Sequence, residues 1–231
     1  MTTVLITGAN RGLGLEFCRQ YAADGWNVIA CCRQPEQAPE LNRLTQHYPS
    51  IQVEALDVAN FTQIDALSEK WADSTIDVLI NNAGVYEDLH SGGFGQLDYQ
   101  SWSHSLVVNT LAPVKMAEAF LPQLKHSNAK LIVNISSLMG SIGDNDGGGS
   151  IIYRSSKAAL NAAMKSVALG LKEQPVGVLI FHPGWVKTDM GGPNALITAE
   201  ESVAGMRSVI NNFSLDQSGS FVKYDGTSMP W

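Results

Sequence analysis

Short, continuous apolar runs alternate along the chain with longer segments in which apolar residues recur every three or four positions. Runs such as IDVLI, KLIVNIS and VGVLIF lack the strict alternation of a strand that has one face in water. Strands of a parallel sheet have this pattern, because helices bury both of their faces. The pattern predicts seven strands, at residues 4–6, 26–32, 51–56, 76–80, 131–135, 176–181 and 219–224.

The segments between these runs predict helices. Leu13, Phe17 and Tyr21, for example, lie at four-residue spacing and share one helix face. Strands that alternate with helices predict an α/β fold, a doubly wound parallel sheet of the Rossmann type with about seven strands and helices on both faces. We expect a single domain over residues 1–231, with a short substrate loop at about residues 185–200.

Composition narrows the classes of protein that this chain can be. Of the 231 residues, 45% are apolar and 16% are charged, which is the balance of a globular protein. The net charge is -7 and the basic residues form no cluster, so we expect neither a nucleic-acid partner nor an anionic membrane surface. No stretch approaches the roughly 20 apolar residues of a membrane span, and no secretory signal opens the chain. We therefore expect a cytoplasmic protein.

The three cysteines, Cys18, Cys31 and Cys32, are expected to be free thiols. Neighbouring cysteines rarely meet the geometry of a disulfide, and an odd number leaves one without a partner. We interpret Cys31 and Cys32 as small residues that close a buried strand, and we predict no metal site.

The first predicted strand runs directly into the turn TGANRGLG, whose glycines are Gly8, Gly12 and Gly14. Glycines at the end of a strand let the backbone turn tightly and approach a pyrophosphate, which the first N–H groups of the next helix then bind. Gly14 would let that helix pack close to the sheet. A tight turn without a ligand is the alternative, but the position on the first strand of an alternating α/β chain favours a dinucleotide.

The type of residue after the second strand indicates whether the site prefers NAD or NADP. An acidic residue there would bind the ribose 2′-OH of NAD, but the chain reads Cys31, Cys32 and Arg33. Arg33, and Arg11 inside the glycine turn, are placed to bind a 2′-phosphate through charge-assisted hydrogen bonds. We therefore expect NADP(H) rather than NAD(H). The alternative is that both arginines are solvated surface charges.

A second group of candidate residues lies further along the chain. Ser137 follows the strand predicted at 131–135, while Tyr153 and Lys157 stand four residues apart in YRSSK at the start of a helix. That spacing brings the two side chains together. We expect Lys157 and an oxidised nicotinamide to lower the pKa of the phenol from its usual value of about 10. Ser137, which the SxxG spacing favours over Ser136, would hold a carbonyl oxygen while Tyr153 protonates it.

A tyrosine and a lysine at this spacing also arise by chance, so the motif gains its weight from its neighbours. In a parallel sheet, the glycine turn, the NNAG turn, the serine and the YxxxK helix all meet at the carboxyl ends of the strands, where ligands bind. The glycine-rich segment 140–150 makes the gap between the serine and the tyrosine wide. We expect a mobile loop there.

Six motifs resemble, in order, those of the short-chain dehydrogenase/reductase family over nearly the whole chain: TGANRGLG, NNAG, VVNTLAP, NISSLMG, YRSSK and HPGWVKTDMGG. With the closing GSFVKYDGTSMPW they look like its C-factor and sniffer-type carbonyl reductase branch. The resemblance implies an NADPH-linked carbonyl reductase with a catalytic tetrad of Asn109, Ser137, Tyr153 and Lys157. Tyr153 would be the general acid, and Asn109 would hold a helix open for a water that connects Lys157 to solvent.

The resemblance also implies the contacts of the cofactor. Asp57 and Val58 would contact the adenine, the NNAG turn the adenosine side, and the loop after the sixth strand the nicotinamide end. The full set of implied cofactor-binding residues is Gly8, Asn10, Arg11, Gly12, Leu13, Gly14, Arg33, Asp57, Val58, Asn82, Ala83, Gly84, Tyr153, Lys157, Pro183, Gly184, Val186 and Thr188.

Family members commonly dimerise through the helices that correspond to KAALNAAMKSVALGLK and APVKMAEAFLPQL in this chain. The resemblance therefore implies a homodimer or homotetramer. The alternative is that both helices simply pack on the sheet.

The expected substrate is a small-molecule ketone, aldehyde or quinone-like compound. Tyr86, Met139, Trp185 and Met190 are candidates for apolar walls of its pocket, and ordinary packing explains each of them equally well. The alternative function is that of an NADP-binding, C-factor-like regulatory protein with little turnover. A sugar-nucleotide epimerase is less favoured, because its usual turn is GxxGxxG.

Overall fold

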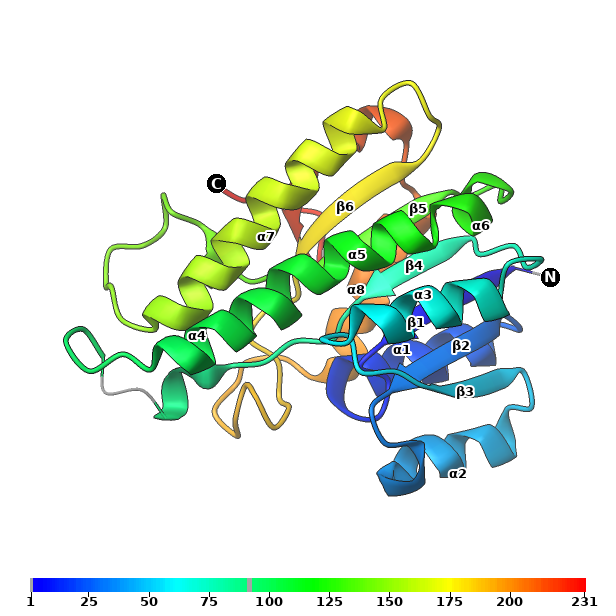
Figure 1. Ribbon diagram of the computed structural model, residues 1–231, viewed down its shortest axis with the longest axis horizontal. Coiled ribbons are helices and arrows are strands. Elements are labelled where there is room, and N and C mark those ends of the chain that lie inside the picture. The colour runs from blue at the N-terminus through cyan, green and yellow to red at the C-terminus, as the bar shows by residue number, and fades with distance from the viewer. Residues whose placement is uncertain (1, 91–92) are drawn as a thin grey trace.

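A parallel seven-stranded sheet forms the centre of the computed structural model, which describes residues 2–90 and 93–231 (Figure 1). The strand order is β3-β2-β1-β4-β5-β6-β7, so the order reverses between β1 and β4. The seven predicted strands and the doubly wound Rossmann-type fold are confirmed. The strands are β1 (Thr3–Thr7), β2 (Asn27–Cys32), β3 (Ile51–Ala55), β4 (Val78–Asn81), β5 (Leu131–Ile135), β6 (Gly177–His182) and β7 (Ser220–Lys223).

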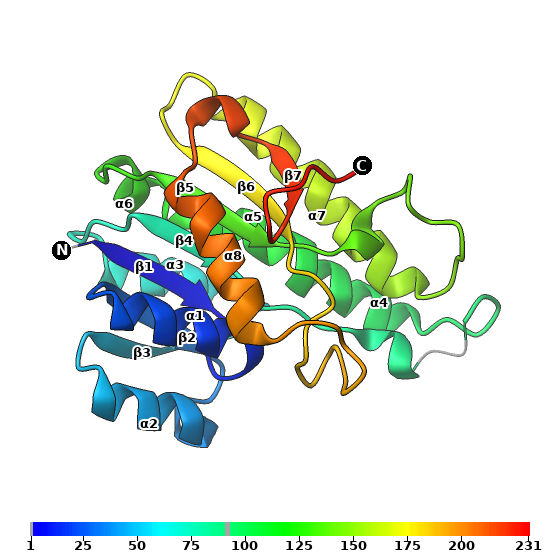
Figure 2. The ribbon, with the colours of Figure 1, turned by 180° about the vertical axis from the view of Figure 1, so that it is seen from behind.

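Helices cover both faces of the sheet. One face carries α3, α4, α5, α6 and α7 (Figure 1), and the other carries α1, α2 and α8 (Figure 2). The helices are α1 (Gly12–Ala23), α2 (Pro39–His47), α3 (Phe61–Lys70), α4 (Tyr99–Leu106), α5 (Ala112–Ala119), α6 (Leu121–Lys125), α7 (Ile151–Gly170) and α8 (Ala199–Asn211).

The apolar core has two layers, one on each face of the sheet. Successive residues of a strand point to opposite faces, so Ile132 of β5 packs in the layer under α7, and Val133 packs in the layer under α1. Phe17 and Tyr21 of α1 are fully buried in the second layer. Both faces of the strands are apolar for this reason, which is why the sequence shows continuous runs instead of alternation.

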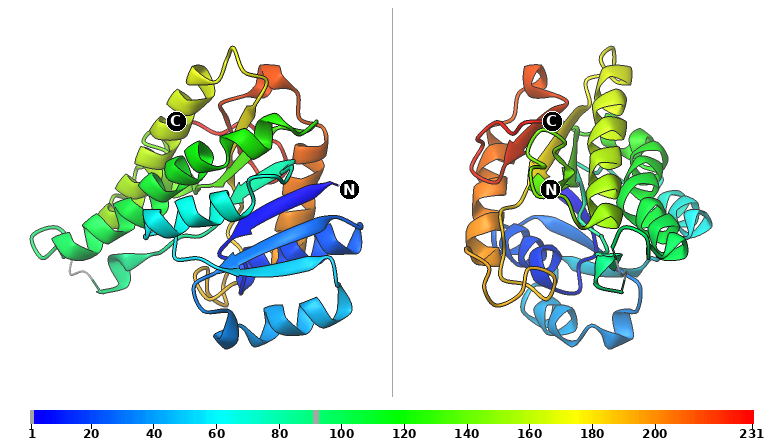
Figure 3. Two further views of the ribbon diagram at one scale, coloured as in Figure 1. Left: turned by 45° about the vertical axis from the view of Figure 1, so that its right-hand side comes forward. Right: turned by 90° about the vertical axis from the view of Figure 1, so that its left-hand side faces the viewer.

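The carboxyl ends of the parallel strands lie at one edge of the sheet, as the side views show (Figure 3). Among the segments that leave this edge are the glycine turn after β1, the NNAG turn after β4, the serine pair after β5 and the loop after β6. Among the described residues, no helix combines the length and the apolar character that a membrane crossing needs.

The connection from β5 to α7 begins with the serine pair and a short 3-10 helix, Leu138–Gly140, and the predicted loop 140–150 follows. Residues 142–149 are exposed. The mobility of this loop stays a prediction, as does association through α5 and α7. The three cysteines are free and buried, as predicted.

Candidate active site

The glycine turn brings three stretches of backbone into close contact. Gly8 and Gly12 have left-handed backbone angles, with φ values of +66° and +54°. A Cβ atom on Gly8 would lie 2.9 Å from the Cα atom of Ala83, and one on Gly14 would overlap the Gly8 carbonyl oxygen. Packing therefore requires Gly8 and Gly14 to be glycine, and backbone conformation favours glycine at position 12.

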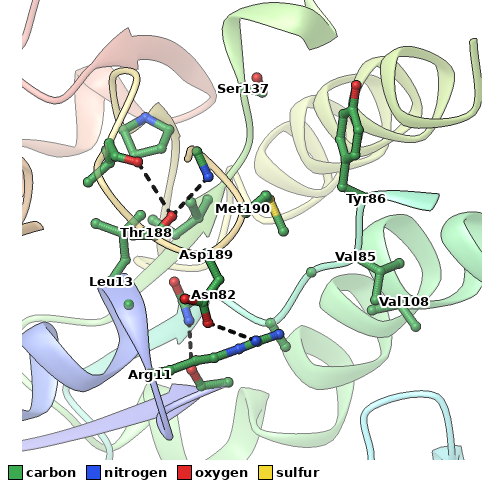
Figure 4. Close-up of a pocket in the computed structure, with 18 of the residues that line it drawn as sticks. Arg11, Leu13, Asn82, Val85, Tyr86, Val108, Ser137, Thr188, Asp189 and Met190 are labelled. Carbon is green, nitrogen blue, oxygen red and sulfur yellow. Dashed lines mark hydrogen bonds and ion pairs between the residues drawn. The ribbon is translucent and has the colours of Figure 1, made fainter. Parts of the chain in front are cut away.

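The NNAG turn is hydrogen-bonded directly to the glycine turn. The Thr7 Oγ1 atom accepts from the backbone N–H groups of Asn82 and Ala83, each at 3.0 Å. The Asn82 amide donates to the carbonyl oxygen of Thr7 at 2.9 Å and to that of Gly8 at 3.1 Å, the bond drawn in Figure 4. Asn82, which sequence reasoning offered as a cofactor contact, therefore also joins the two turns.

Tyr153 and Lys157 lie on successive turns of α7, and they are only 7% and 4% exposed. The Lys157 Nζ atom donates to the carbonyl oxygen of Ile135, the last residue of β5, at 2.9 Å. It lies 5.7 Å from the centre of the Tyr153 ring. The four-residue spacing thus places an ammonium group beside the phenol.

The two serines that follow β5 have different surroundings. Ser136 is buried, and its hydroxyl donates to the Asn161 side chain of α7 at 2.6 Å. Ser137, in extended backbone, lines the cavity described below together with Tyr153, and its hydroxyl accepts from the Met139 N–H at 3.1 Å. Of the two serines, the structure therefore places Ser137 beside the phenol.

Burial controls the protonation of the tyrosine and the lysine. It raises the pKa of Tyr153 to about 12, although the nearby Ser137 hydroxyl acts to lower that pKa. It lowers the pKa of Lys157 to about 8. The side chains around Tyr153 thus do not produce the expected low pKa of its phenol. Burial removes water from the phenolate, and the resulting rise in pKa is larger than the lowering by neighbouring groups. At neutral pH the phenol is protonated and most of the lysine is charged.

Asn109 lies in a widened turn, the π-helix Val107–Leu111, between α4 and α5. Its side-chain oxygen accepts from the Val85 N–H at 2.8 Å, and its amide group donates to the Val85 carbonyl and to the Ser156 hydroxyl, each at 2.9 Å. The buried Asn109 amide therefore links the NNAG segment to α7. Widened turns of this kind are frequent at functional sites.

These elements surround a cavity of about 440 Å³ (Figure 4), a volume typical of small-molecule sites. Two of the predicted site residues, Gly14 and Asn109, lie outside its lining. The predicted residues that line it are Gly8, Asn10, Arg11, Gly12, Leu13, Arg33, Asp57, Val58, Asn82, Ala83, Gly84, Ser137, Tyr153, Lys157, Pro183, Gly184, Val186 and Thr188.

The cavity has the features that a dinucleotide phosphate needs. The backbone approaches closely at Gly8, and Arg11, which precedes α1, places no side-chain acceptor on the first N–H groups of that helix. Those groups are available to a phosphate. Arg33 adds a positive charge after β2, where an acidic residue would repel a 2′-phosphate.

Arg11 has a partner that sequence reasoning did not identify. Its guanidinium lies 2.9 Å from the Asp189 carboxylate, and both side chains are exposed (Figure 4). This ion pair joins the glycine turn to the loop that follows β6.

The four predicted apolar wall residues all line the cavity. Trp185 and Met190 are about half exposed at its rim, and the Trp185 indole donates to the Gly191 carbonyl at 2.8 Å. Tyr86 packs against the Tyr153 ring, with 4.8 Å between the ring centres, and Met139 completes the set. All four side chains therefore border the cavity, and their contact with a substrate stays a prediction.

Comparison with known proteins adds to this geometry. A family model for the short chain dehydrogenases matches residues 2–196. The chain belongs to this family. Among the relatives of this dehydrogenase is C-signal of Myxococcus xanthus, which is 42% identical over 159 residues, or 68% of this chain and 93% of that protein.

Solved structures of other members superpose closely on this dehydrogenase. The carbonyl reductase Sniffer of D. melanogaster is 36% identical with a TM-score of 0.92, and all of both chains is covered. The NADPH-bound carbonyl reductase from chicken fatty liver is also 36% identical with a TM-score of 0.92, over 100% of this chain and 99% of that one.

The predicted site residues omit three polar residues of the dehydrogenase site, although two of them, Thr7 and Asp189, lie inside the quoted motifs TGANRGLG and HPGWVKTDMGG. They are Thr7, whose hydroxyl holds the NNAG turn, Asp88, whose carboxylate holds the start of α7, and Asp189, which pairs with Arg11. Their partners lie 64 to 178 residues away along the chain, and only the folded structure brings them together.

We expect Lys157 to make the stability of the dehydrogenase depend on pH. Its pKa is about 8 in the folded protein against 10.5 ordinarily, so between these values the unfolded chain binds more protons and the free energy of unfolding rises with pH. Lys157→Met should remove this rise. Chemical denaturation at pH of about 7.5 and about 9.5 measures it, and Lys172→Met, which changes an exposed lysine, is the control. An equal rise in wild type and Lys157→Met would contradict the burial argument.

Proposed function

We propose that this short-chain dehydrogenase is an NADPH-dependent carbonyl reductase in which Tyr153 is the general acid. One observation carries the proposal. The Ser137 hydroxyl and the Tyr153 phenol lie beside one another in the wall of a cavity that the glycine turn, the NNAG turn and Arg33 also line. A carbonyl oxygen that enters between the two hydroxyls accepts a hydrogen bond from each.

The side chains of the protein perform the acid step. Burial keeps Tyr153 protonated at neutral pH, because its pKa is about 12, so the proton donor is in the correct state. When bound, NADPH supplies the hydride for the carbonyl carbon. As negative charge develops on the carbonyl oxygen, Tyr153 transfers its proton to that oxygen and Ser137 keeps its hydrogen bond to it. The Lys157 ammonium stabilises the phenolate that remains.

Lys157 is the group through which Tyr153 regains a proton. Its ammonium is held on the Ile135 carbonyl, and the Asn109 side chain and the Lys157 Nζ atom both face Gly84, at 3.2 and 3.5 Å from the position of a Cβ atom there. We assign to the π-helix around Asn109 the role of holding a water that connects Lys157 to solvent. The proposed tetrad consists of Asn109, Ser137, Tyr153 and Lys157.

The residues present favour NADPH over NADH. Arg33 follows β2 in the position where NAD-binding sites carry an acidic residue. Since Arg11 is engaged by Asp189, Arg33 is the principal ligand that we assign to the 2′-phosphate. Asp57 and Val58 are assigned to the adenine, the NNAG turn to the adenosine side, and the loop from Pro183 to Thr188 to the nicotinamide end.

The relatives support a carbonyl as the substrate, because both solved structures described above are carbonyl reductases. The apolar walls formed by Tyr86, Met139, Trp185 and Met190 favour a ketone, aldehyde or quinone with an apolar body. The similarity to C-signal supports a second candidate, an NADP-binding regulatory protein with little turnover. We place it second because a protein that only binds the nucleotide does not need Ser137, Tyr153 and Lys157 together.

We expect the purified protein to oxidise NADPH in the presence of reactive diketones, quinones or aromatic aldehydes. Tyr153→Phe should lower kcat about a hundredfold or more, the contribution of a general acid, and should keep the affinity for NADPH. The absorbance of the reduced nicotinamide follows the reaction. Tyr99→Phe, at a tyrosine that is 70% exposed on α4, is the matched control and should retain wild-type turnover. Tight binding of NADPH without turnover of any carbonyl would instead favour the regulatory protein.

We also expect Arg33→Asp to shift the cofactor preference from NADPH toward NADH. The substitution removes charge-assisted hydrogen bonds to the 2′-phosphate, which corresponds to a loss of about tenfold to a hundredfold in NADPH affinity. Fluorescence titration with both nucleotides measures the ratio of the two dissociation constants. Arg43→Asp, at an exposed arginine of α2, should leave that ratio at its wild-type value. An unchanged ratio in Arg33→Asp would show that this arginine does not bind the phosphate.

A further inference from the structure

The helix that carries the proposed acid does not cap its own N-terminus. Ser150, which precedes α7, has a left-handed backbone with φ of 43°, and its side chain makes no capping hydrogen bond to the helix. Its hydroxyl is instead hydrogen-bonded to the Tyr86 hydroxyl at 2.7 Å. The first N–H groups of a helix need acceptors from outside the helix, so α7 depends on another segment for them.

Asp88 supplies these acceptors from a distant part of the chain. One carboxylate oxygen accepts from the Ile152 N–H at 3.1 Å, and the other accepts from the Tyr153 N–H at 2.7 Å. Both oxygens of one carboxylate therefore bind consecutive N–H groups at the positive end of the helix dipole, where a negative charge is stabilising. The shorter of the two bonds is made to the backbone of the proposed acid itself.

Asp88 belongs to a short segment that also contacts the cofactor side of the cavity. The segment leaves β4 through Asn82, which bonds the glycine turn, and ends in the 3-10 helix Glu87–His90. Between them, the Tyr86 ring lies 4.8 Å from the Tyr153 ring, with the planes inclined at 57°. One stretch of backbone thus joins the glycine turn to Tyr153, the proposed proton donor.

Neighbouring contacts hold this segment in place. The Glu87 carboxylate lies 2.9 Å from the His104 ring nitrogen of α4, so the residue before Asp88 is tied to a second helix. The Trp102 indole of α4 donates to the Ser155 hydroxyl of α7 at 2.8 Å. Contacts with α4 therefore fix the position of the segment that carries the Asp88 carboxylate.

We propose that Asp88 is the positioning residue for proton donation, because it fixes the first turn of α7. It thereby fixes the distance between the Tyr153 hydroxyl and the glycine turn. The proposal rests on the proposed function, in which Tyr153 is the acid. The twenty-residue helix α7 packs its buried Leu160 and Met164 in the core, so the helix does not need this cap to form. The cap determines where the first turn lies.

Asp88→Ala should lower kcat at least about tenfold, since a small misplacement of a reacting group is costly, and should leave the dissociation constant of NADPH unchanged. Asp88→Asn keeps one acceptor oxygen without the charge, so its kcat should lie between those of wild type and Asp88→Ala. In the Tyr153→Phe background, Asp88→Ala should have no further effect, because the group that Asp88 positions is absent. An equal loss in both backgrounds would overturn the proposal.

Asp98 offers a matched control on a neighbouring helix. It is the N-cap residue of α4, and one of its carboxylate oxygens accepts from the Gln100 and Ser101 N–H groups at 2.9 and 3.3 Å, but it contacts no residue of the proposed tetrad within the described structure. Asp98→Ala should keep wild-type kcat. A loss as large as that of Asp88→Ala would mean that any frayed helix end reduces turnover, and it would overturn the assignment.

Amide hydrogen exchange tests the same contact without turnover. Peptides that contain Ile152 and Tyr153 should exchange faster in Asp88→Ala than in wild type, while the remainder of α7 should be unchanged. Faster exchange with undiminished kcat, or no change in exchange, would overturn the proposal. If the wild-type protein reduces no carbonyl, the proposed function fails by that result, and the exchange rates still decide whether Asp88 holds Tyr153.

Discussion

The parallel pairing of β1, β4 and β5 is the constraint on which the site depends. The register pairs Ile6 with Ile80, and Ile80 with Val133, so the three strands end side by side. Every motif that follows a strand must then emerge at the same edge. A buried amide pair, in which Asn81 donates to Asn134 at 3.0 Å, adds a polar contact across the last rung of β4 and β5. The apolar layers on either face hold this edge in place.

The same arrangement buries charge where chemistry needs it. Lys157 is nearly inaccessible to solvent, and its ammonium has one backbone acceptor, the Ile135 carbonyl, at the end of β5. Burial at such a position costs stability, and it brings the lysine pKa to about 8, close to physiological pH. The phenol of Tyr153 moves in the opposite direction, to a pKa of about 12. Acid–base sites commonly contain groups whose pKa values are shifted by their surroundings.

The fold was predictable from the sequence because burial on both faces leaves a direct pattern in the strands. The YxxxK spacing likewise determined that Tyr153 and Lys157 share a helix face, since helical geometry is local. The pKa of Tyr153 was not predictable, because it depends on how much water the folded site excludes. The Asp88 carboxylate lies 64 residues before the Ile152 N–H that it accepts from, and no local pattern reports such a contact.

The pH dependence of turnover tests most directly the claim that buried Lys157 supports proton donation by Tyr153. Since Tyr153 stays protonated up to a pKa of about 12 and Lys157 loses its charge at about 8, kcat/KM for carbonyl reduction should be level in neutral solution and should fall as the pH rises through 8. Lys157→Arg, whose guanidinium keeps its charge, should move that fall to a higher pH. A fall at the same pH in Lys157→Arg, or a rate that rises with pH, would contradict the account.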